Sequence, residues 1–291
     1  MLKSPIKWAG GKSRLMKEIE VVYPKNFVEH PETFTYIEPF AGGGSSWIYV
    51  LQTYNPKAII VNDVNPMLIN FWEVVKKYPT ELCDVLEDIQ SKYASMTWEE
   101  RKDAYHEAKN AFNELKRHYV DTDIELAALF LFLNKTCFNG LYRTTKKGDF
   151  NTAFGKPANP NITPVIYNRQ DIMELSRMIQ NVVFTCGDYK HAANYITDNT
   201  LVYLDPPYRG TWTGYSQNGF DESDQEELAW FCKSMIDENC YVIESNSMCH
   251  NNFFEKNYPD FHIKVVNNVS RNVRPTAERK VQEILMYNLT A

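Results

Sequence analysis

An apolar run that stops at a carboxylate and two prolines constrains the fold of this chain more than any other stretch. Residues 201–204 are Leu-Val-Tyr-Leu, which predicts a buried parallel strand, and Asp205, Pro206, Pro207 and Tyr208 follow. Neither proline has an N–H group to donate and each fixes φ, so the strand ends there and the next turn is stiff. The sequence therefore predicts an acid, rigid carbonyls and a ring at the C-terminal edge of a sheet, where open α/β sheets bind ligands.

This set of groups suits attack by the exocyclic amino group of a flat base. The amino lone pair is delocalised into the ring, which makes the nitrogen a poor nucleophile. Asp205 can accept one N–H and the Pro206 carbonyl the other, so that the lone pair points at an electrophile. Tyr208 would stack on the face of a base swung out of its duplex. A plain turn is the alternative, and these four residues alone leave it open.

A second strand, turn and helix pattern lies nearer the N-terminus. Residues 35–45 predict a strand, a glycine turn that includes Phe40 and Gly42, and the start of a helix, and a strand over 57–63 ends at Asp63. A glycine turn with an acid about 20 residues later is typical of a nucleoside cofactor on a Rossmann-type sheet. The glycines do not follow G-x-G-x-x-G, which favours S-adenosylmethionine over NAD. A strand-end turn is the alternative role for Asp63.

Two shorter motifs fit the same site. Asp188 and Tyr189 follow a predicted strand at 182–186, and their acid and ring could bracket the adenine of a cofactor. The segment 7–13 contains Trp8, Gly11 and Lys12 and resembles a phosphate loop only superficially, because that motif needs a glycine at position 6. Its glycine pair before a helix suits a carboxylate, with a capped surface helix as the alternative.

The middle of the chain predicts helices followed by a hairpin. Capping boxes at Thr97–Glu100 and Thr122–Glu125 indicate two helix starts, and the apolar helix over 124–133 should be buried. The hairpin carries four cations against one acid, interleaved with four rings, which fits a protein that reads a DNA groove, rather than an exposed solubilising hairpin. These residues are Lys135, Arg143, Lys146, Lys147, Asp149, Phe138, Tyr142, Phe150 and Phe154.

The last third predicts a return to α/β alternation. A helix capped at Ser223 runs to about 238, a strand covers 241–246, and 262–269 with 281–289 should form an antiparallel pair. A loop between the two strands of that pair carries Arg271 and Arg274, a second basic patch suited to phosphates.

Composition limits the possible partners. The chain has 291 residues and a formal net charge of −6, so positive charge for nucleic acid must be concentrated locally. No apolar run reaches the ~20 residues of a membrane span and no signal-peptide pattern is present, which predicts a cytoplasmic protein. The six cysteines show no metal spacing, which predicts reduced thiols and no metal site.

Taken together, these motifs resemble the Dam-type N6-adenine-specific DNA methyltransferases (D12 class, alpha-group). The resemblance covers nearly the whole chain and rests on motif order: Lys-Trp-Ala-Gly-Gly-Lys, Glu-Pro-Phe-Ala-Gly-Gly-Gly-Ser, Phe-Asn-Gly-Leu-Tyr-Arg, Gly-Asp-Tyr and Asp-Pro-Pro-Tyr. It implies an α/β fold with a Rossmann-like S-adenosylmethionine-dependent methyltransferase sheet in residues 1–65 and 165–291. A helical target-recognition domain would be inserted at 66–164, with its DNA-reading β-hairpin near 138–155.

The resemblance also implies a reaction and its residues. The enzyme would methylate N6 of an adenine flipped out of double-stranded DNA, in GATC or a related site, and release S-adenosylhomocysteine without a metal. The catalytic residues would be Asp205, Pro206, Pro207 and Tyr208. The cofactor would contact Trp8, Gly11, Lys12, Phe40, Gly42, Asp63, Asp188, Tyr189 and Asp205. DNA would contact Phe138 as a wedge, Asn139, Leu141 and Arg143 as base readers, and Lys146, Lys147, Arg271 and Arg274.

One departure bears on the target sequence. Relatives often carry Asn-Val-Pro-Phe-Gly where this chain has Asn-Thr-Ala-Phe-Gly from residue 151. The sequence therefore leaves open which DNA contacts that side of the hairpin makes. The competing hypotheses are methylation of RNA or of cytosine N4, a DNA-binding regulator without activity, and a P-loop ATPase. Oligomeric state, processivity and a restriction endonuclease that shares the site also stay open.

Overall fold

A mostly parallel sheet forms the centre of the computed structural model, which describes residues 1–156, 159, 162, 164–209, 220–248, 251–266 and 282–288. Within these residues the seven-stranded sheet has the order β3-β2-β1-β4-β5-β7-β6. The strands are β1 (Thr35–Glu38), β2 (Ala58–Asp63), β3 (Val182–Cys186), β4 (Thr200–Leu204), β5 (Tyr241–Ser247), β6 (His262–Val266) and β7 (Glu283–Tyr287). β1 to β5 run parallel, whereas β7 is antiparallel to both β5 and β6. The predicted Rossmann-like α/β fold class and the closing antiparallel pair are therefore confirmed.

The chain reverses its direction of travel across the sheet between β1 and β4. From β1 the sheet grows through β2 to β3 on one side, and from β4 through β5 on the other. The connections that leave the carboxyl ends of β1 and β4 therefore run to opposite sides. This is a topological switch point, where α/β sheets leave room for a ligand. All five residues of β4 are buried, as the apolar run predicted, and Asp205 follows directly at this point.

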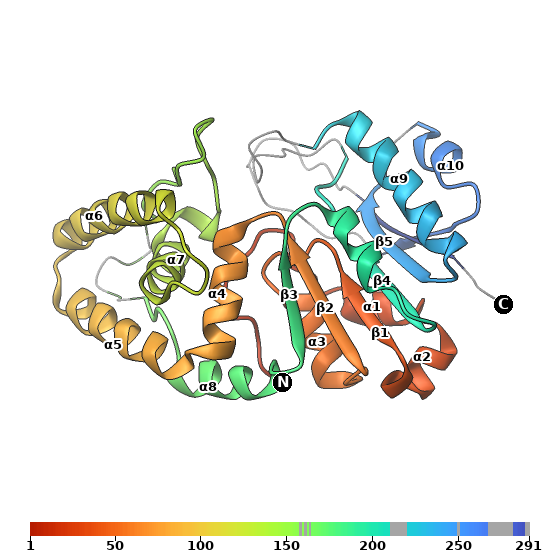
Figure 1. Ribbon diagram of the computed structural model, residues 1–291. Coiled ribbons are helices and arrows are strands. Elements are labelled where there is room, and N and C mark those ends of the chain that lie inside the picture. Colours follow the sequence, from red (N-terminus) through yellow and green to blue (C-terminus); the bar gives the residue numbers. More distant parts are fainter. Residues whose placement is uncertain are drawn as a thin grey trace.

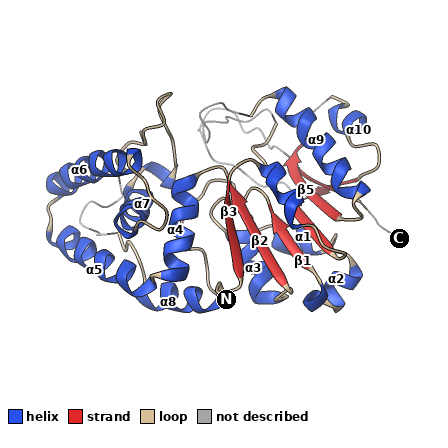
Figure 2. Ribbon diagram, viewed as in Figure 1, coloured by secondary structure: helices blue, strands red, loops and turns tan. Residues whose placement is uncertain are grey.

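Alternation along the strands produces one core on each face of the sheet. Tyr36, Ile59 and Leu201 belong to one core, and their sequence neighbours Ile37, Ile60 and Val202 belong to the other. Helices cover both faces in Figures 1 and 2. The first core is covered by α1 (Met16–Glu20), α2 (Lys25–Glu29), α3 (Ser45–Thr53) and α4 (Pro66–Lys77), and the second by η3 (Tyr189–Tyr195), α9 (Glu222–Asp237) and α10 (Phe253–Asn257).

A helical lobe stands beside the β3 edge of the sheet, with α4 between the two (Figure 1). The lobe contains α5 (Pro79–Ser95), α6 (Trp98–Arg117), α7 (Ile124–Thr136) and α8 (Arg169–Met178). α7 contacts α4, α5 and α6, and it is buried nearly all round, as its apolar sequence predicted. α8 packs on α4 and α5, so the chain passes through the lobe once more before β3. The division into 1–65 with 165–291 and 66–164 stays a prediction.

The structure confirms one predicted helix cap and corrects two. Thr97 and Glu100 form the predicted capping box of α6. The N-cap of α7 is Asp123 and not Thr122, because the Asp123 carboxylate accepts the Leu126 N–H at 2.9 Å. α9 likewise begins earlier than predicted. Its capping box is formed by Asp221 and Asp224, and Ser223 already lies inside the helix. In both corrections a carboxylate occupies the cap, where its charge also suits the positive helix end.

No helix in the described part of the chain is both long and apolar enough to cross a membrane. The five cysteines in that part are all free thiols. The same residues contain no group of three or more His, Cys, Asp and Glu side chains that could hold a metal ion.

Candidate active site and nucleic-acid interface

Trp8 lies directly on the glycine turn that follows β1. A Cβ atom on Gly43 would stand 2.4 Å from the Trp8 Cβ, and one on Gly42 would stand 3.0 Å from the indole ring. Gly42 and Gly44 also have positive φ values of 49° and 81°, which glycine adopts at little cost. The turn must therefore be built from glycine, both for its backbone and for the indole that covers it.

Asp63 anchors the same turn from the end of β2. Its two carboxylate oxygens accept the Gly42 N–H at 3.0 Å and the Asn65 N–H at 2.9 Å. Burial raises the pKa of Asp63, and these two backbone hydrogen bonds oppose that rise. The predicted acid and the predicted glycine turn are therefore in direct contact.

The turn after β3 joins this group. Asn62 donates through Nδ2 to the Pro39 carbonyl at 3.1 Å and to the Gly187 carbonyl at 3.0 Å, which ties the turns after β1 and β3 together. Phe40 stacks on Tyr189 with ring centroids 5.2 Å apart. Asp188 caps η3 by accepting the Lys190 N–H at 2.9 Å. Phe40, Asp63, Asp188 and Tyr189, predicted from separate motifs, thus line one edge of the sheet.

A short, largely buried ion pair at this edge joins Lys12 to Asp205. The Lys12 ammonium lies 2.6 Å from Asp205 Oδ2 and donates to the Gly10 carbonyl at 2.7 Å. Lys12 is only 2% exposed, and its backbone N–H donates to Ser45 Oγ at 2.8 Å, at the start of α3. Gly11 lies against the same serine, because a Cβ atom there would be 3.5 Å from Ser45 Oγ. The N-terminal loop therefore supplies a buried cation to the carboxylate at the end of β4.

The turn after Asp205 is braced from three sides. Gln225 of α9 donates to the Pro207 carbonyl at 2.8 Å, and Asn246 of β5 accepts the Arg209 N–H at 3.1 Å. Tyr208 donates its hydroxyl to Glu283 of β7, and the Lys12 ammonium lies 4.9 Å from the Tyr208 ring centre. Among the described residues no hydrogen bond reaches the Pro206 carbonyl, and Pro206 itself is buried.

Three buried glutamates surround this edge, and none of them was assigned a role from the sequence. Burial raises the pKa of Glu38 to about 8, although Ser46 and Tyr36 donate hydrogen bonds to it. Burial likewise raises the pKa of Glu244 to about 7, against hydrogen bonds led by the one from Asn246. Glu283 lies 3.6 Å from the Lys12 ammonium. An acid inside an otherwise apolar strand pattern was the sequence signal for Glu244 and Glu283.

The N-terminal loop also contacts the predicted DNA-reading turn. Asn134, near the end of α7, accepts the Lys7 N–H at 2.8 Å and donates to the Lys7 carbonyl at 2.7 Å. The same amide donates to the Gly140 carbonyl at 3.2 Å, and a Cβ atom on Gly140 would stand 2.4 Å from the Lys7 Cβ. The loop that ends in Lys12 is thus fixed to the turn at 138–140.

That turn is the short helix η2 (Phe138–Gly140), and it presents two of the predicted DNA residues to solvent. Phe138 is 51% exposed. Asn139 is exposed as well and has φ 55° and ψ 18°, the left-handed conformation that asparagine tolerates better than most residues. A buried ring at 138 would have excluded the predicted wedge, so the position is compatible with that role.

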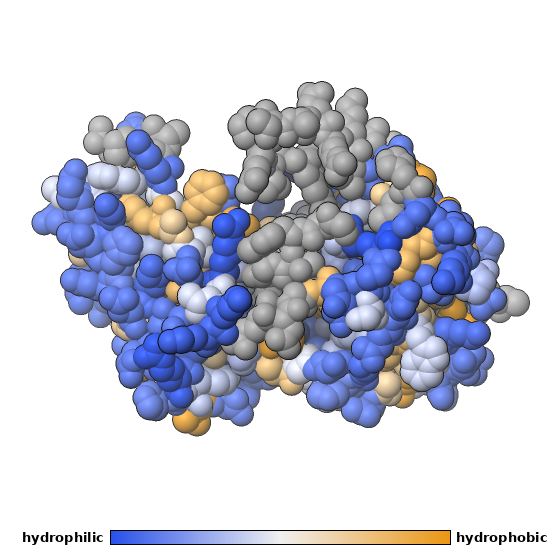
Figure 3. Space-filling view, turned by 90° about the horizontal axis from the view of Figure 1, so that it is seen from above, coloured by the Kyte–Doolittle hydropathy of each residue, from blue (hydrophilic) through white to orange (hydrophobic). Residues whose placement is uncertain are grey.

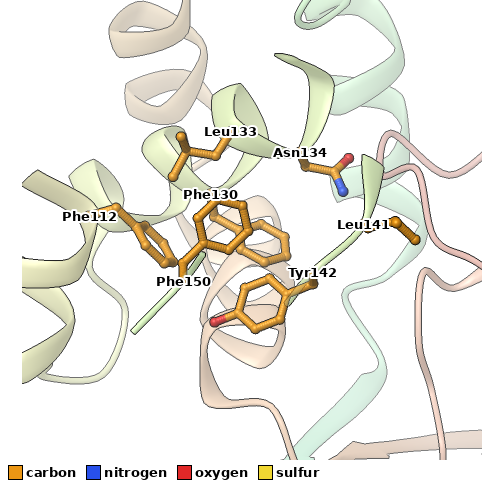
Figure 4. Close-up of a pocket in the computed structure, with 7 residues that line it drawn as sticks. All are labelled: Phe112, Phe130, Leu133, Asn134, Leu141, Tyr142 and Phe150. Carbon is orange, nitrogen blue, oxygen red and sulfur yellow. The ribbon is translucent and has the colours of Figure 1, made fainter. Parts of the chain in front are cut away.

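Two of the other three hairpin rings, Tyr142 and Phe150, point inward, whereas Phe154 is half-buried. Figure 4 shows Tyr142 and Phe150 facing Phe112 and Phe130 in a space too small to admit a water molecule. Tyr142 and Phe150 are 6% and 3% exposed. Tyr142 and Phe150 therefore hold the hairpin on α6 and α7. Of the four predicted cations, Arg143, Lys146 and Lys147 are exposed, whereas Lys135 is half-buried and lies in α7.

The hairpin pairs irregularly, by isolated bridges at Cys137–Phe154 and Thr144–Phe150. Thr152 links its two arms: its hydroxyl donates to the Leu141 carbonyl at 2.8 Å and accepts the Arg143 N–H at 3.2 Å. Leu141 is half-buried, whereas the side chains of Arg143, Lys146 and Lys147 are exposed. Arg271 and Arg274 lie outside the described residues.

A basic concave surface beside the hairpin was not predicted from the sequence. It lies between α6 and the returning arm of the hairpin and encloses about 490 Å³. Seen from above, the helical lobe presents mainly hydrophilic side chains, with a small apolar patch among them (Figure 3). The polar and aromatic residues that line the surface are Trp98, Lys102, His106, Lys109, Asn151, Thr152, Phe154 and Lys156. On α6 its basic side chains recur at positions 102, 106 and 109, a helical spacing that could have revealed them.

Comparison with known proteins gives one consistent result. A family model described as D12 class N6 adenine-specific DNA methyltransferase matches residues 8–272. The Type II methyltransferase M.MjaIII of Methanocaldococcus jannaschii is 36% identical over 91% of this chain and 91% of its own. The Retron Ec67 DNA adenine methylase of Escherichia coli is 31% identical over 83% of this chain and 76% of its own. The DNA adenine methylase of Vibrio cholerae is 28% identical over 96% of this chain and 94% of its own.

Proposed function

Because this chain belongs to the D12 class N6 adenine-specific DNA methyltransferases, we propose that it transfers a methyl group from S-adenosylmethionine to an adenine flipped out of duplex DNA. The observation that carries the proposal is the Lys12–Asp205 contact of 2.6 Å at the switch point of the sheet. This ion pair lies between a glycine turn suited to a nucleoside and a helical lobe that carries exposed cations. We propose the cytoplasm as its compartment.

The residues around the glycine turn fit the proposed cofactor. The acid at the end of β2 can accept the ribose hydroxyls, and the stacked pair of Phe40 and Tyr189 offers an aromatic wall for adenine. Trp8 provides a face that suits a cation. When bound, S-adenosylmethionine supplies an electrophilic methyl on a sulfonium, and no metal is needed for that chemistry.

Asp205 and Pro206 would orient the adenine amine. The Asp205 carboxylate has lone pairs for more than one donor, so the amine would share it with Lys12. The Pro206 carbonyl would accept the second N–H, and the two hydrogen bonds together favour a pyramidal nitrogen. The extra proton would leave the methylated nitrogen through Asp205 or through water. Lys12 would hold the carboxylate in place throughout.

Tyr208 would stack on the flipped base. Its hydroxyl is bonded inward to Glu283, so the orientation of the ring is fixed. The residue is 5% exposed, and the Lys12 ammonium occupies one face of the ring. A base can therefore stack only on the other face, and only after neighbouring side chains move.

The helical lobe would bind and read the DNA. Phe138 would fill the space that the flipped adenine leaves, and Arg143 would contact a base edge in the major groove. Lys146, Lys147 and the basic concave surface beside α6 would contact phosphates, which fix the position of the protein without reading sequence. We propose GATC or a related site as the target. The overall acidic chain would then bind DNA through local groups of cations.

Tracing the methyl group tests this proposal. The purified protein would be incubated with plasmid DNA and tritium-labelled S-adenosylmethionine, and the DNA would then be digested to nucleosides. We expect the label in N6-methyladenine, and sequencing of the same plasmid should place the modified adenines in one short motif. Label in N4-methylcytosine, or label only when RNA is offered, would favour the competing transferases instead.

A further inference from the structure

Glu283 is a buried carboxylate that the proposed reaction does not use directly. It is the first residue of β7 and is 3% exposed, while Ile284, Leu285 and Met286 after it are buried and apolar. A buried carboxylate costs several kcal/mol of desolvation unless it is paired. Its neighbours include the Tyr208 hydroxyl, which donates to Glu283 Oε1, and the Lys12 ammonium at 3.6 Å. Both neighbours belong to the active-site edge, so the acid belongs to that edge as well.

Lys12 is shared between two carboxylates at this edge. Its ammonium lies 2.6 Å from Asp205 and 3.6 Å from Glu283. Tyr208 stays neutral because burial raises its pKa well above the ordinary value. Whatever other charges lie near, Glu283 makes this edge one unit more negative than a neutral side chain would. In a largely buried place such a unit interacts strongly with a nearby cation.

We propose that Glu283 supplies negative charge by which this site favours the cationic methyl donor over the neutral product. This inference rests on S-adenosylmethionine as the proposed donor. The sulfonium of the donor carries a positive charge, whereas the thioether sulfur of S-adenosylhomocysteine carries none. Without Glu283, more of the charge of Lys12 would act on Asp205. With Glu283, that charge is shared, and more of the negative charge of Asp205 is available to a second cation.

Glu283 acts through Lys12 and touches neither reactant in this account, so it is a positioning residue. Its place on the closing antiparallel strand gives that strand a role in the reaction. β7 pairs with β5 and β6 and brings an acid from the last part of the sheet to the carboxyl end of β4. The consequence for turnover is direct, because a site that favours the donor is less readily blocked by the product.

Calorimetry on the full-length protein tests the proposal without any methyl transfer. The affinities of S-adenosylmethionine and S-adenosylhomocysteine are measured for the wild type and for Glu283→Gln, which keeps an acceptor for Tyr208 but loses the charge. We expect the variant to bind the donor about tenfold more weakly and the product within about twofold, since only the donor is charged. Equal losses for both ligands, or no loss, would overturn the proposal.

Two further variants separate charge from structure. Glu107→Gln removes the charge of an exposed glutamate of α6, away from this edge, so its donor-to-product affinity ratio should match the wild type. Glu283→Asp keeps the charge and should also keep the ratio, which provides a test if Glu283→Gln does not fold. A changed ratio in Glu283→Asp with normal product binding would contradict the charge account. A wild type that binds neither ligand would refute the proposed donor itself, which is a different failure.

Discussion

The Lys12 ammonium and the Asp205 carboxylate are 2.6 Å apart although 193 positions separate them in the chain. Lys12 comes from the N-terminal loop and Asp205 from the end of β4, so this ion pair forms only when both segments are folded. The same loop is fixed to the turn at 138–140 through Asn134 and Lys7. One short segment therefore contacts both the proposed catalytic carboxylate and the proposed DNA-reading turn.

Phe138 and Phe150 should differ sharply when each is replaced by alanine. Phe150 is 3% exposed in an aromatic cluster, so Phe150→Ala should lower the free energy of unfolding by about 3–5 kcal/mol. Phe138 is 51% exposed, so Phe138→Ala should change it by less than about 0.5 kcal/mol. Urea unfolding measures both. Phe138→Ala should instead reduce base flipping, seen as weaker fluorescence of 2-aminopurine at the target position. Normal flipping in this variant would remove the wedge role.

Arg143→Ala should relax the choice of base at one position of the target. We expect a loss of discrimination of about 1–3 kcal/mol at that base pair and little change at the others. The measurement is the methylation rate on a set of duplexes that differ by single base pairs. An unchanged preference would show that Arg143 does not read sequence.

Thr152→Val tests whether the arms of the hairpin must be linked for reading. Valine has nearly the same shape but cannot bond to the Leu141 carbonyl or the Arg143 N–H, which Thr152 contacts at 2.8 and 3.2 Å. We expect discrimination to fall while the rate on the preferred site changes little. A variant with full discrimination would mean that packing alone holds Arg143 in place.

Lys102 and Lys109 should matter for affinity and not for sequence. If they contact phosphates, replacing both with alanine should weaken binding equally for target and unrelated duplexes. The plot of the logarithm of the DNA-binding constant against the logarithm of the salt concentration should also become less steep, by about one unit of slope for each phosphate that the protein no longer neutralises. Lys233→Ala is the matched control, because Lys233 is an exposed lysine of α9 and should leave the slope unchanged. Weaker binding of the target duplex alone would contradict a phosphate role.

Glu38 should make the stability of the protein depend on pH. Burial raises its pKa from 4.5 to about 8, so the folded state holds this proton more tightly than the unfolded chain. Its stabilising contribution is complete below pH 4.5 and is lost as the pH rises through about 8. The melting temperature should therefore fall from about pH 5 to about pH 8 and level off above that, and the fall should be less steep in Glu38→Gln. The exposed Glu227→Gln is the control, and equal slopes in all three proteins would contradict this assignment.

Local patterns in the sequence were enough to predict which residues lie at the carboxyl ends of the strands. The apolar run before Asp205 ends where two prolines follow, and the strand before Asp63 ends in a turn, so each carboxylate could be placed at a strand end. The carboxyl ends of parallel strands lie at the same edge of a sheet, so these acids could be predicted to lie near one another. The glycine turn was predictable for the same reason, because its requirement for glycine is local.

Contacts between distant segments could not be predicted in this way. The pairing of Lys12 with Asp205, and of Glu283 with Tyr208, depends on where the N-terminal loop and β7 come to rest. Which rings of the hairpin face inward was also hidden, because an irregular loop has no period that assigns its faces. The caps of α7 and α9 were misplaced because several adjacent polar residues could each serve as the cap.

The most direct test of the account is the single-turnover rate of Asp205→Ala on duplex DNA that contains the target site. The variant should fold, since Glu283 remains to pair with Lys12, and it should bind DNA with nearly the affinity of the wild type. Its methylation rate should fall by about a thousandfold or more, because the amine loses the acceptor that orients it. A rate within about tenfold of the wild type, with DNA binding intact, would contradict the role given to Asp205 and the mechanism built on it.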